Sequence, residues 1–331
     1  MQLLSLFCGA GGLDLGFRQS GYNLKLAIDW SEAAIKTHKH NFPESTALKQ
    51  DLLQLGVPGM LELCSQYFTE SEAMGIIGGP PCQGFSRGNP NSFADDPRNK
   101  LAILYVEFIT EVQKKFNVDF VVFENVLGIK DKKHIHTYNK ITSQLDLIGY
   151  DVYENELNAV NFGVAQERRR VIIVAIKKGL SKKKLTLIPS NPEGRSKTVR
   201  DVISGLPEPI FFQRKMVASD IGFHPNHWTM YPKSEKFRNP ELLLNKKRSF
   251  RTINWDKPSP TIAYGNREIY VHPDKKRRLS IFESMLLQGF PKEFVLKGTL
   301  SQQVTQVSNA VPPPMAFGIA QAVKSIIKEA L

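Results

Sequence analysis

Residues 75–86 read GIIGGPPCQGFS, a stretch that joins a predicted strand to the loop after it. The apolar residues before Gly78 are typical of a short buried strand, which we expect to end there. Pro80 and Pro81 lack backbone N–H donors, so neither a helix nor a central strand continues through them. Cys82 therefore stands on a stiff loop at the carboxyl end of a strand, where open α/β sheets place their chemistry.

The same alternation of short apolar runs and helical patterns extends through the first half of the chain. Strand-like runs are LLSLF, LKLAID, GIIGG, DFVVFENV and RVIIVAI, and helical spacing is seen in SEAAIKTHKHNF and LAILYVEFITEVQKKF. Because strands alternate with helices, the sequence predicts an α/β fold with a doubly wound, mostly parallel sheet.

The second half has a different texture. From Lys177 to about Gly298 the chain is rich in Lys, Arg, Pro and Asn, with short elements such as TVRDVISGLP and RRLSIFESMLLQGFP. This predicts a second, smaller and irregular domain. The final stretch, PPPMAFGIAQAVKSIIKEAL, is typical of a helix that begins with prolines. Four apolar residues share one face of this helix, so it should pack onto a core: Met315, Ile319, Val323 and Ile326.

Charge is distributed unevenly along the 331 residues, whose net charge is +12. Residues 1–176 hold 17 Lys and Arg against 20 Asp and Glu, whereas residues 177–331 hold 27 against 12. A basic second half indicates a polyanionic partner. Charge alone does not separate such a surface from an ordinary soluble one.

Composition excludes several classes of protein. No apolar run approaches the ~20 residues of a membrane helix, and the glycine-rich start is not typical of a signal peptide. The three cysteines, Cys8, Cys64 and Cys82, form no CxxC pair. We therefore expect no disulfide framework, no metal site and no membrane partner, and a reducing cytoplasm fits.

A glycine-rich turn follows the first predicted strand in SLFCGAGGLDLGF, residues 5–17. It does not match the dinucleotide fingerprint G-x-G-x-x-G, because Asp14 occupies the position of the third glycine. A nicotinamide enzyme is therefore disfavoured. The turn still allows a ligand to approach the backbone closely, although a purely structural turn is an equally good interpretation.

Two acidic positions downstream fit a nucleoside. Asp29 and Trp30 end the second predicted strand, where a carboxylate can accept hydrogen bonds from ribose hydroxyls and an indole can stack on adenine. Asp51 could accept a hydrogen bond from the adenine amino group. Each residue alone is more often solvated surface or core. Together with the turn they indicate an adenosine pocket without a phosphate site.

A second polar group is predicted at the edge of the sheet that carries Cys82. Glu124 and Asn125 follow a strand-like run, and Arg168 and Arg170, two residues apart, share a face if that segment is extended. A thiol, a carboxylate and two guanidinium groups would supply a nucleophile, a proton donor or acceptor, and charge stabilisation. Either kind of charged residue alone would more often form a surface ion pair.

These blocks together resemble the bacterial cytosine-5 DNA methyltransferases of restriction–modification systems. The resemblance rests on LFCGAGGLDLGF, AIDW, GGPPCQGFS, FENV, QERRRVIIV, RRLSIFESMLLQGFP and QVSNAVPPPMA, which extend across nearly the whole chain. It implies a catalytic and cofactor-binding domain at 1–184, a target-recognition domain at 185–303, and a C-terminal helix at 304–331 that returns to the first domain.

The resemblance implies methyl transfer from S-adenosylmethionine to carbon 5 of a cytosine flipped out of a specific double-stranded DNA sequence. Cys82 would form a covalent bond to carbon 6, and Glu124 would hydrogen-bond the ring. Arg168 and Arg170 would bind the carbonyl oxygen and a nearby phosphate. Pro81 and Asn125 complete the implied catalytic set, and the loop after Cys82 would close over the DNA.

The resemblance also implies binding residues and two departures from the family pattern. The implied cofactor-binding residues are Phe7, Gly9, Ala10, Gly11, Gly12, Asp29, Trp30, Asp51, Leu52, Pro80, Leu101, Asn309 and Val311. The implied DNA-binding residues are Gln83, Ser86, Arg87, Arg98, Lys246, Lys247, Arg248, Arg251 and Arg267. Ser5 stands where the family usually has Asp, and Ser308 where it usually has Gly.

Three alternative functions stay open. One is a tRNA cytosine-5 methyltransferase of the same family, and another is an inactive DNA-binding regulator, for which loss of Cys82 or Glu124 would be expected. The third is a metal protein that uses His224, His227 and a cysteine. The family reading implies a monomer in the bacterial cytoplasm, acting at the nucleoid, with a separate restriction endonuclease as partner. The target sequence cannot be read from the residues.

Overall fold

The computed structural model describes residues 1–81, 84–85, 99–180, 184–187, 196–239, 250–261 and 270–328. The chain divides into two compact units. The first unit comprises Met1–Asn158, Arg169–Ile188 and Ala316–Leu331, and the second comprises Ala159–Arg168 and Pro189–Met315. Within the described ranges, no helix combines the length and the apolar character needed to cross a membrane.

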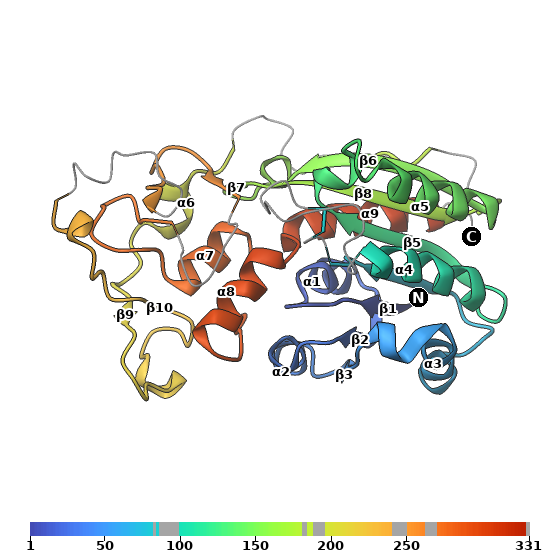
Figure 1. Ribbon diagram of the computed structural model, residues 1–331, viewed down its shortest axis with the longest axis horizontal. Coiled ribbons are helices and arrows are strands. Elements are labelled where there is room, and N and C mark those ends of the chain that lie inside the picture. Colours follow the sequence, from blue (N-terminus) through green and yellow to red (C-terminus); the bar gives the residue numbers. More distant parts are fainter. Residues whose placement is uncertain are drawn as a thin grey trace. The chain divides into compact units, whose positions relative to one another are not determined.

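The first unit is built on a central sheet (Figure 1). Its strands are β1 (Gln2–Leu6), β2 (Asn23–Asp29), β3 (Thr46–Lys49), β4 (Met74–Gly78), β5 (Val118–Asn125), β6 (Tyr150–Asn158) and β8 (Arg169–Lys177). Among the described residues these seven strands have the order β3-β2-β1-β4-β5-β8-β6. β1 to β5 pair in parallel, whereas β8 is antiparallel to both β5 and β6. The predicted mostly parallel α/β fold is confirmed.

Helices cover both faces of this sheet. They are α1 (Gly12–Gln19), α2 (Glu32–Asn41), α3 (Leu52–Tyr67), α4 (Asn99–Val112), α5 (Ile135–Leu147) and α9 (Pro313–Lys328), with a short 3-10 helix η1 (Leu127–Lys130) after β5. Apolar residues of α3, α4 and α5 share one core with residues of β1, β4 and β5. On the opposite face, Phe17 of α1 stacks on Phe120 of β5. Because the helices cover the faces of the sheet, a functional site is expected at the carboxyl edge of the parallel strands.

Local sequence explains where several helices begin. The Ser31 side chain accepts a hydrogen bond from the Ala34 backbone N–H and caps α2, and Asp51 caps α3 in the same way. Gly11 precedes α1 with φ 81°, a left-handed conformation that favours glycine. α3 is interrupted at Gly56, where φ is 62°.

Helix α9 contributes to the first unit from Ala316 onward. Met315, Ile319, Val323 and Ile326 are all buried, as their spacing predicted. A Cβ atom at Gly16 of α1 would lie 2.4 Å from the backbone nitrogen of Phe317 in α9. Glycine is therefore required at position 16, because the two helices approach through their backbones.

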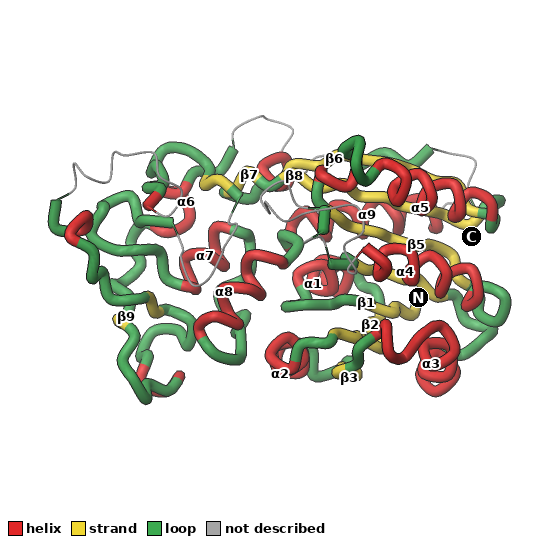
Figure 2. The backbone as a smooth tube through the Cα atoms, in the orientation of Figure 1, coloured by secondary structure: helices red, strands yellow, loops and turns green. Residues whose placement is uncertain are grey.

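The second unit has short elements joined by long loops (Figure 2). Its described helices and strands are η2 (Ala159–Phe162), β7 (Gln166–Glu167), α6 (Val199–Ile203), β9 (Ile210–Phe211), η3 (Ala218–Asp220), β10 (Trp228–Thr229), η4 (Glu235–Phe237), β11 (Ser259–Pro260), α7 (Ile281–Leu287) and α8 (Leu300–Asn309). A buried ion pair anchors α7, because the guanidinium of Arg277 donates two hydrogen bonds of 2.9 Å to the carboxylate of Glu283.

The functional domains expected at 185–303 and 304–331 stay a prediction, and the second compact unit has bounds of its own. Residues 159–168 belong to it because β7 pairs with β11. Residues up to Met315 belong to it as well, and the Gln288 side chain just after α7 donates to the Ala310 carbonyl just after α8 at 2.6 Å. These tertiary contacts lie within the unit, and composition does not reveal them.

Candidate active site

Polar residues of the first unit gather at one edge of the sheet. The parallel strands β1, β2, β4 and β5 all end at this edge, and β8 begins there because it runs antiparallel to β5. The edge therefore brings together the glycine-rich turn after β1, Asp29 at the end of β2, the loop after β4, Glu124 on β5 and Arg170 on β8.

Glu124 and Arg170 form an ion pair in which Arg170 Nε lies 2.8 Å from Glu124 Oε1. Each side chain is only 10% exposed. A Cβ atom at Gly79 would lie 2.8 Å from Glu124 Oε2, so glycine at this position leaves room for the carboxylate. The carboxylate is thus held between β8 and the loop that follows β4.

Asn125 fixes the loop that leads to Cys82. Its side-chain amide donates to the carbonyl of Pro80 at 3.2 Å, and its side-chain oxygen accepts from the Val126 backbone N–H at 2.9 Å. Asn125 is fully buried and Pro81 is half-buried. The hydrogen bond from Asn125 to Pro80 thus holds the segment that leads to the thiol. Cys82 itself lies outside the described residues.

The two predicted arginines belong to different units. Arg168 is buried in the second unit, where its Nη2 donates to the Ser308 carbonyl at 2.7 Å. Arg170 is buried in the first unit, and Arg169 between them is exposed. Burial thus alternates along these three residues, as expected for an extended segment. Direct contact of either with a base or phosphate stays a prediction.

The glycine-rich turn after β1 is held in an unusual conformation. Phe7, Gly9 and Gly11 have φ values of 57°, 54° and 81°. A positive φ costs a non-glycine residue such as Phe7 roughly 1–2 kcal/mol, and such strain is concentrated at functional sites. The Gly9 backbone N–H donates to Asp29 Oδ2 at 2.9 Å, so the turn is tied directly to the end of β2.

The expected nucleoside residues lie at the same edge. Asp29 is 8% exposed, and burial raises the pKa of its carboxyl. Trp30 follows directly and is 71% exposed, so its indole is open to a stacking partner. Asp51 is exposed and accepts from the Leu53 backbone N–H at 2.9 Å.

Other predicted cofactor residues are placed by the structure as follows. In the first unit Ala10, Gly12, Leu52 and Pro80 are buried and Leu101 is half-buried, and in the second unit Asn309 is exposed and Val311 is buried.

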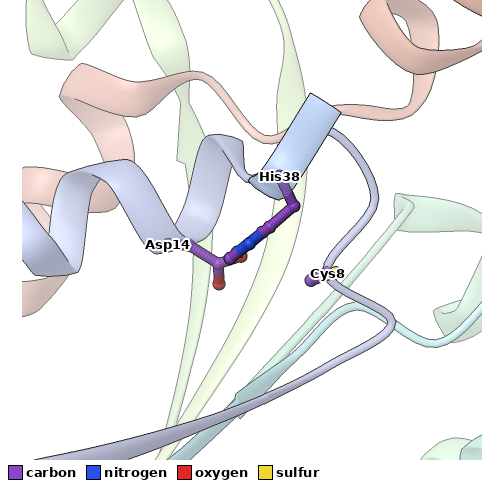
Figure 3. A group of neighbouring side chains, drawn as sticks. All are labelled: Cys8, Asp14 and His38. Carbon is purple, nitrogen blue, oxygen red and sulfur yellow. The ribbon is translucent and has the colours of Figure 1, made fainter. Parts of the chain in front are cut away.

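Sequence reasoning missed a buried polar group beneath the turn. Figure 3 shows Asp14 of α1 and His38 of α2 directed toward each other, with Cys8 of the turn beside them. The Ser5 hydroxyl donates to Asp14 Oδ1 at 2.5 Å, and His38 Nε2 lies 3.1 Å from Asp14 Oδ2. The signal available in the sequence was Asp14 itself, the residue that breaks the glycine fingerprint.

The two histidines considered as metal ligands contact protein groups instead. The ring nitrogens of His227 lie 3.0 Å from Ser280 Oγ and 2.7 Å from the Pro207 carbonyl. His224 stacks on Phe282 with ring centres 4.0 Å apart, and burial lowers its pKa to about 4.

Most of the predicted DNA contacts are not described. Arg251 is exposed, with its guanidinium 5.9 Å from the centre of the Tyr270 ring. The residues outside the described ranges are Gln83, Ser86, Arg87, Arg98, Lys246, Lys247, Arg248 and Arg267.

The doubly wound sheet with helices on both faces has the fold of the α/β methyltransferase class. The fold resembles that of a prophage-encoded DNA modification methyltransferase of E. coli, with a TM-score of 0.80 and 24% identity over 99% of each chain. It also resembles DNMT2 of Spodoptera frugiperda, with a TM-score of 0.68 and 19% identity over 98% of this chain and 99% of that one.

Sequence comparison narrows the class to one family. The chain belongs to the C-5 cytosine-specific DNA methylase family, which it matches over residues 1–325. It is 33% identical to the type II methyltransferase M1.HphI of Haemophilus parahaemolyticus, over 97% of this chain and 86% of the relative. Identity to the type II methyltransferase M.MthTI of Methanothermobacter thermautotrophicus is 32%, over 100% and 99%. The protein is a DNA cytosine methyltransferase.

Proposed function

We propose that this enzyme methylates carbon 5 of a flipped-out cytosine within a specific double-stranded DNA sequence, through a covalent bond between Cys82 and carbon 6. The Glu124–Arg170 pair carries this proposal, because it holds a carboxylate beside the loop that leads to Cys82. That arrangement supplies a ring-binding group next to a nucleophile.

The residues at the edge of the sheet fit S-adenosylmethionine as the methyl donor. The exposed indole of Trp30 offers a stacking surface for adenine, and the adjacent Asp29 offers a carboxylate for the ribose hydroxyls. The turn from Phe7 to Gly11 permits close approach of the methionine portion. When bound, this molecule supplies an electrophilic methyl group on its sulfonium.

Cys82 would activate an otherwise unreactive carbon. Its thiolate adds to carbon 6 of cytosine, and the electrons of the 5,6 double bond become available at carbon 5. Carbon 5 then forms the bond to the methyl group. Loss of the carbon 5 proton to a base and departure of the thiolate restore the double bond. The prolines before Cys82 and the Asn125–Pro80 hydrogen bond limit the freedom of this thiol.

Glu124 would bind the ring during this sequence. Its carboxyl group is proposed to hold the proton at N3 and to accept a hydrogen bond from the amino group, which stabilises the ring after addition. Arg170 would orient the Glu124 carboxylate through the 2.8 Å contact and bind the carbonyl oxygen of the base. Arg168 would support a nearby phosphate.

Recognition of the target is proposed to reside in residues 185–303. The target carbon is inaccessible inside a duplex, so the cytosine must be flipped out at a cost of a few kcal/mol. The charge of residues 177–331, with 27 basic against 12 acidic side chains, supports phosphate binding there. Homology to type II methyltransferases supports a restriction endonuclease that acts separately on the same sequence.

Transfer of labelled methyl groups from S-adenosylmethionine to DNA or to tRNA tests this function directly. We expect incorporation into DNA and none into tRNA, whereas the reverse result would identify a tRNA enzyme. Bisulfite sequencing of DNA from a host that expresses this chain would then reveal the target sequence. The Cys82→Ser variant serves as the inactive control for both measurements.

A further inference from the structure

The buried group beneath the glycine-rich turn contains three kinds of metal-ligating atom. Cys8 lies on the turn, Asp14 in the first turn of α1 and His38 in α2. The sulfur of Cys8, a carboxylate oxygen of Asp14 and a ring nitrogen of His38 all lie within 4.8 Å of one another. Each residue is less than a tenth exposed. Three elements therefore converge on one small buried volume.

This set of atoms matches the chemistry of zinc. Zinc prefers thiolate, imidazole and carboxylate ligands at about 2.0 to 2.3 Å, which places tetrahedral ligand atoms roughly 3.3–3.8 Å apart. His38 Nε2 and Asp14 Oδ2 are already 3.1 Å apart. The sulfur of Cys8 lies within 4.8 Å of the other two ligand atoms, so movements of about 1 Å would bring all three to the distances of a tetrahedral site. Cys8 also packs in an apolar cluster with Ala27 and Ile35, which would form an apolar wall on one side of such an ion.

The imidazole of His38 gives a second, independent indication. Its Nδ1 is buried and has no hydrogen-bond partner among the described residues, while Nε2 contacts Asp14. A buried imidazole nitrogen without a partner loses the free energy of a hydrogen bond. An ion placed beside Asp14 would take Nε2, the nitrogen that faces this carboxylate, as its imidazole ligand. His38 therefore belongs to the group through Nε2, and its buried, unpartnered Nδ1 shows that it is not a fully satisfied core residue.

We propose that Cys8, Asp14 and His38 bind one zinc ion, which fastens the turn after β1 to α1 and α2. The Cys8 thiol loses its proton to solvent and its sulfur bonds the ion, while neutral His38 and ionised Asp14 donate one lone pair each. A water molecule fills the fourth tetrahedral position. The ion would stabilise, in the folded state, the same turn to which we propose that S-adenosylmethionine binds.

Cobalt(II) is the probe for this site, because it replaces zinc in tetrahedral sites and absorbs light. One equivalent of Co²⁺ added to the reduced full-length protein should give a cobalt–thiolate charge-transfer band, which one equivalent of Zn²⁺ abolishes. Cys8→Ser and His38→Asn should each lose the band. Cys64→Ser, which changes another buried free cysteine, and Cys82→Ser should each retain it.

Two measurements on the unaltered protein guard against variants that fail to fold. X-ray absorption of the zinc-loaded protein should show one sulfur at about 2.3 Å with nitrogen or oxygen as the other ligands. One equivalent of zinc should also raise the unfolding midpoint, and a chelator should reverse the rise. The proposal is wrong if no thiolate band forms, if Cys8→Ser retains the band, or if Cys82→Ser loses it.

Discussion

Arg170 Nε and Glu124 Oε1 lie 2.8 Å apart on neighbouring antiparallel strands, and nine-tenths of each side chain is buried. Removing one partner of such a pair leaves a buried charge uncompensated, which is typically far more costly than losing a surface pair. The rigid strands β5 and β8 therefore fix both the position and the orientation of the carboxylate.

Substitution at this pair should slow the reaction more than it weakens binding. Glu124→Gln should still bind cofactor and DNA but react ~10²–10⁴-fold more slowly, because an acid–base contribution is lost. Arg170→Lys should lower kcat as well, because an ammonium group cannot reproduce the guanidinium fork. The matched control is Arg169→Lys, whose side chain is 61% exposed. Equal single-turnover rates for the two lysine variants would contradict the positioning role of Arg170.

Cys82 should form a trapped adduct with DNA that contains 5-fluorocytosine at the target. Fluorine cannot leave carbon 5 as a proton does, so elimination stalls after methyl transfer and the adduct survives denaturation. Cys82→Ser should form almost none, because a serine hydroxyl is scarcely ionised at neutral pH, yet it should still bind DNA. Cys64→Ser provides the control. Methylation by Cys82→Ser at the normal rate would rule out covalent catalysis.

Trp30→Ala should weaken cofactor binding without changing stability. Lost stacking and burial are worth on the order of 1–3 kcal/mol, which corresponds to about a 5- to 150-fold higher Kd by calorimetry. The unfolding midpoint should stay unchanged, because the side chain is 71% exposed. Leu147→Ala, at a residue 79% exposed on α5, is the control for a generic surface effect. An unaltered Kd for Trp30→Ala would remove the stacking role.

Non-specific DNA binding should fall steeply as salt rises. Each phosphate neutralised by a lysine or arginine releases counterions, so an extensive basic surface loses about a hundredfold or more between 50 and 200 mM salt. Fluorescence anisotropy with a DNA duplex that lacks the target measures this slope. A flat profile would mean that the basic second half of the chain faces something other than DNA.

Acid should destabilise the protein partly through His224. Burial lowers its pKa to about 4, below the ordinary value of about 6.5, so the unfolded chain takes up the proton first as the pH falls. Its contribution to stability is therefore complete above about pH 6.5 and declines toward pH 4. His224→Gln should lose less stability than the wild type over this range in urea unfolding. His136→Gln, at an exposed site, should follow the wild-type profile.

The parts of the fold that were predictable are those with a strong local pattern. β4 ends at Gly78, where prolines follow shortly, and β5 and β8 coincide with uninterrupted apolar runs. α3 was not predicted because Gly56 and a nearby proline interrupt its pattern. β6 was missed as well, since this strand at the edge of the sheet alternates polar residues with apolar ones.

Within the candidate site, the sequence indicated which residues reach one edge of the sheet but not how they pair. Adjacent strand ends led to the expectation that Glu124 lies near the thiol loop, and a Cβ atom at Gly79 of that loop would lie 2.8 Å from Glu124 Oε2. The hydrogen bond between Arg168 and the Ser308 carbonyl joins residues 140 positions apart, and no local pattern encodes such a distance. The Ser5–Asp14–His38 contacts likewise require a strand and two helices to be assembled first.

The packing of α9 against α1 has a consequence for synthesis on the ribosome. Lys324 of the last helix donates to the Ser20 carbonyl just after α1, a contact between residues 304 positions apart. α1 emerges early in translation, yet its partner α9 is made only after all the residues between them. Until then the apolar surface that α9 covers is exposed on the nascent chain, where it can aggregate or attract proteases. The core between α1 and α9 is thus complete only after α9 has left the ribosome.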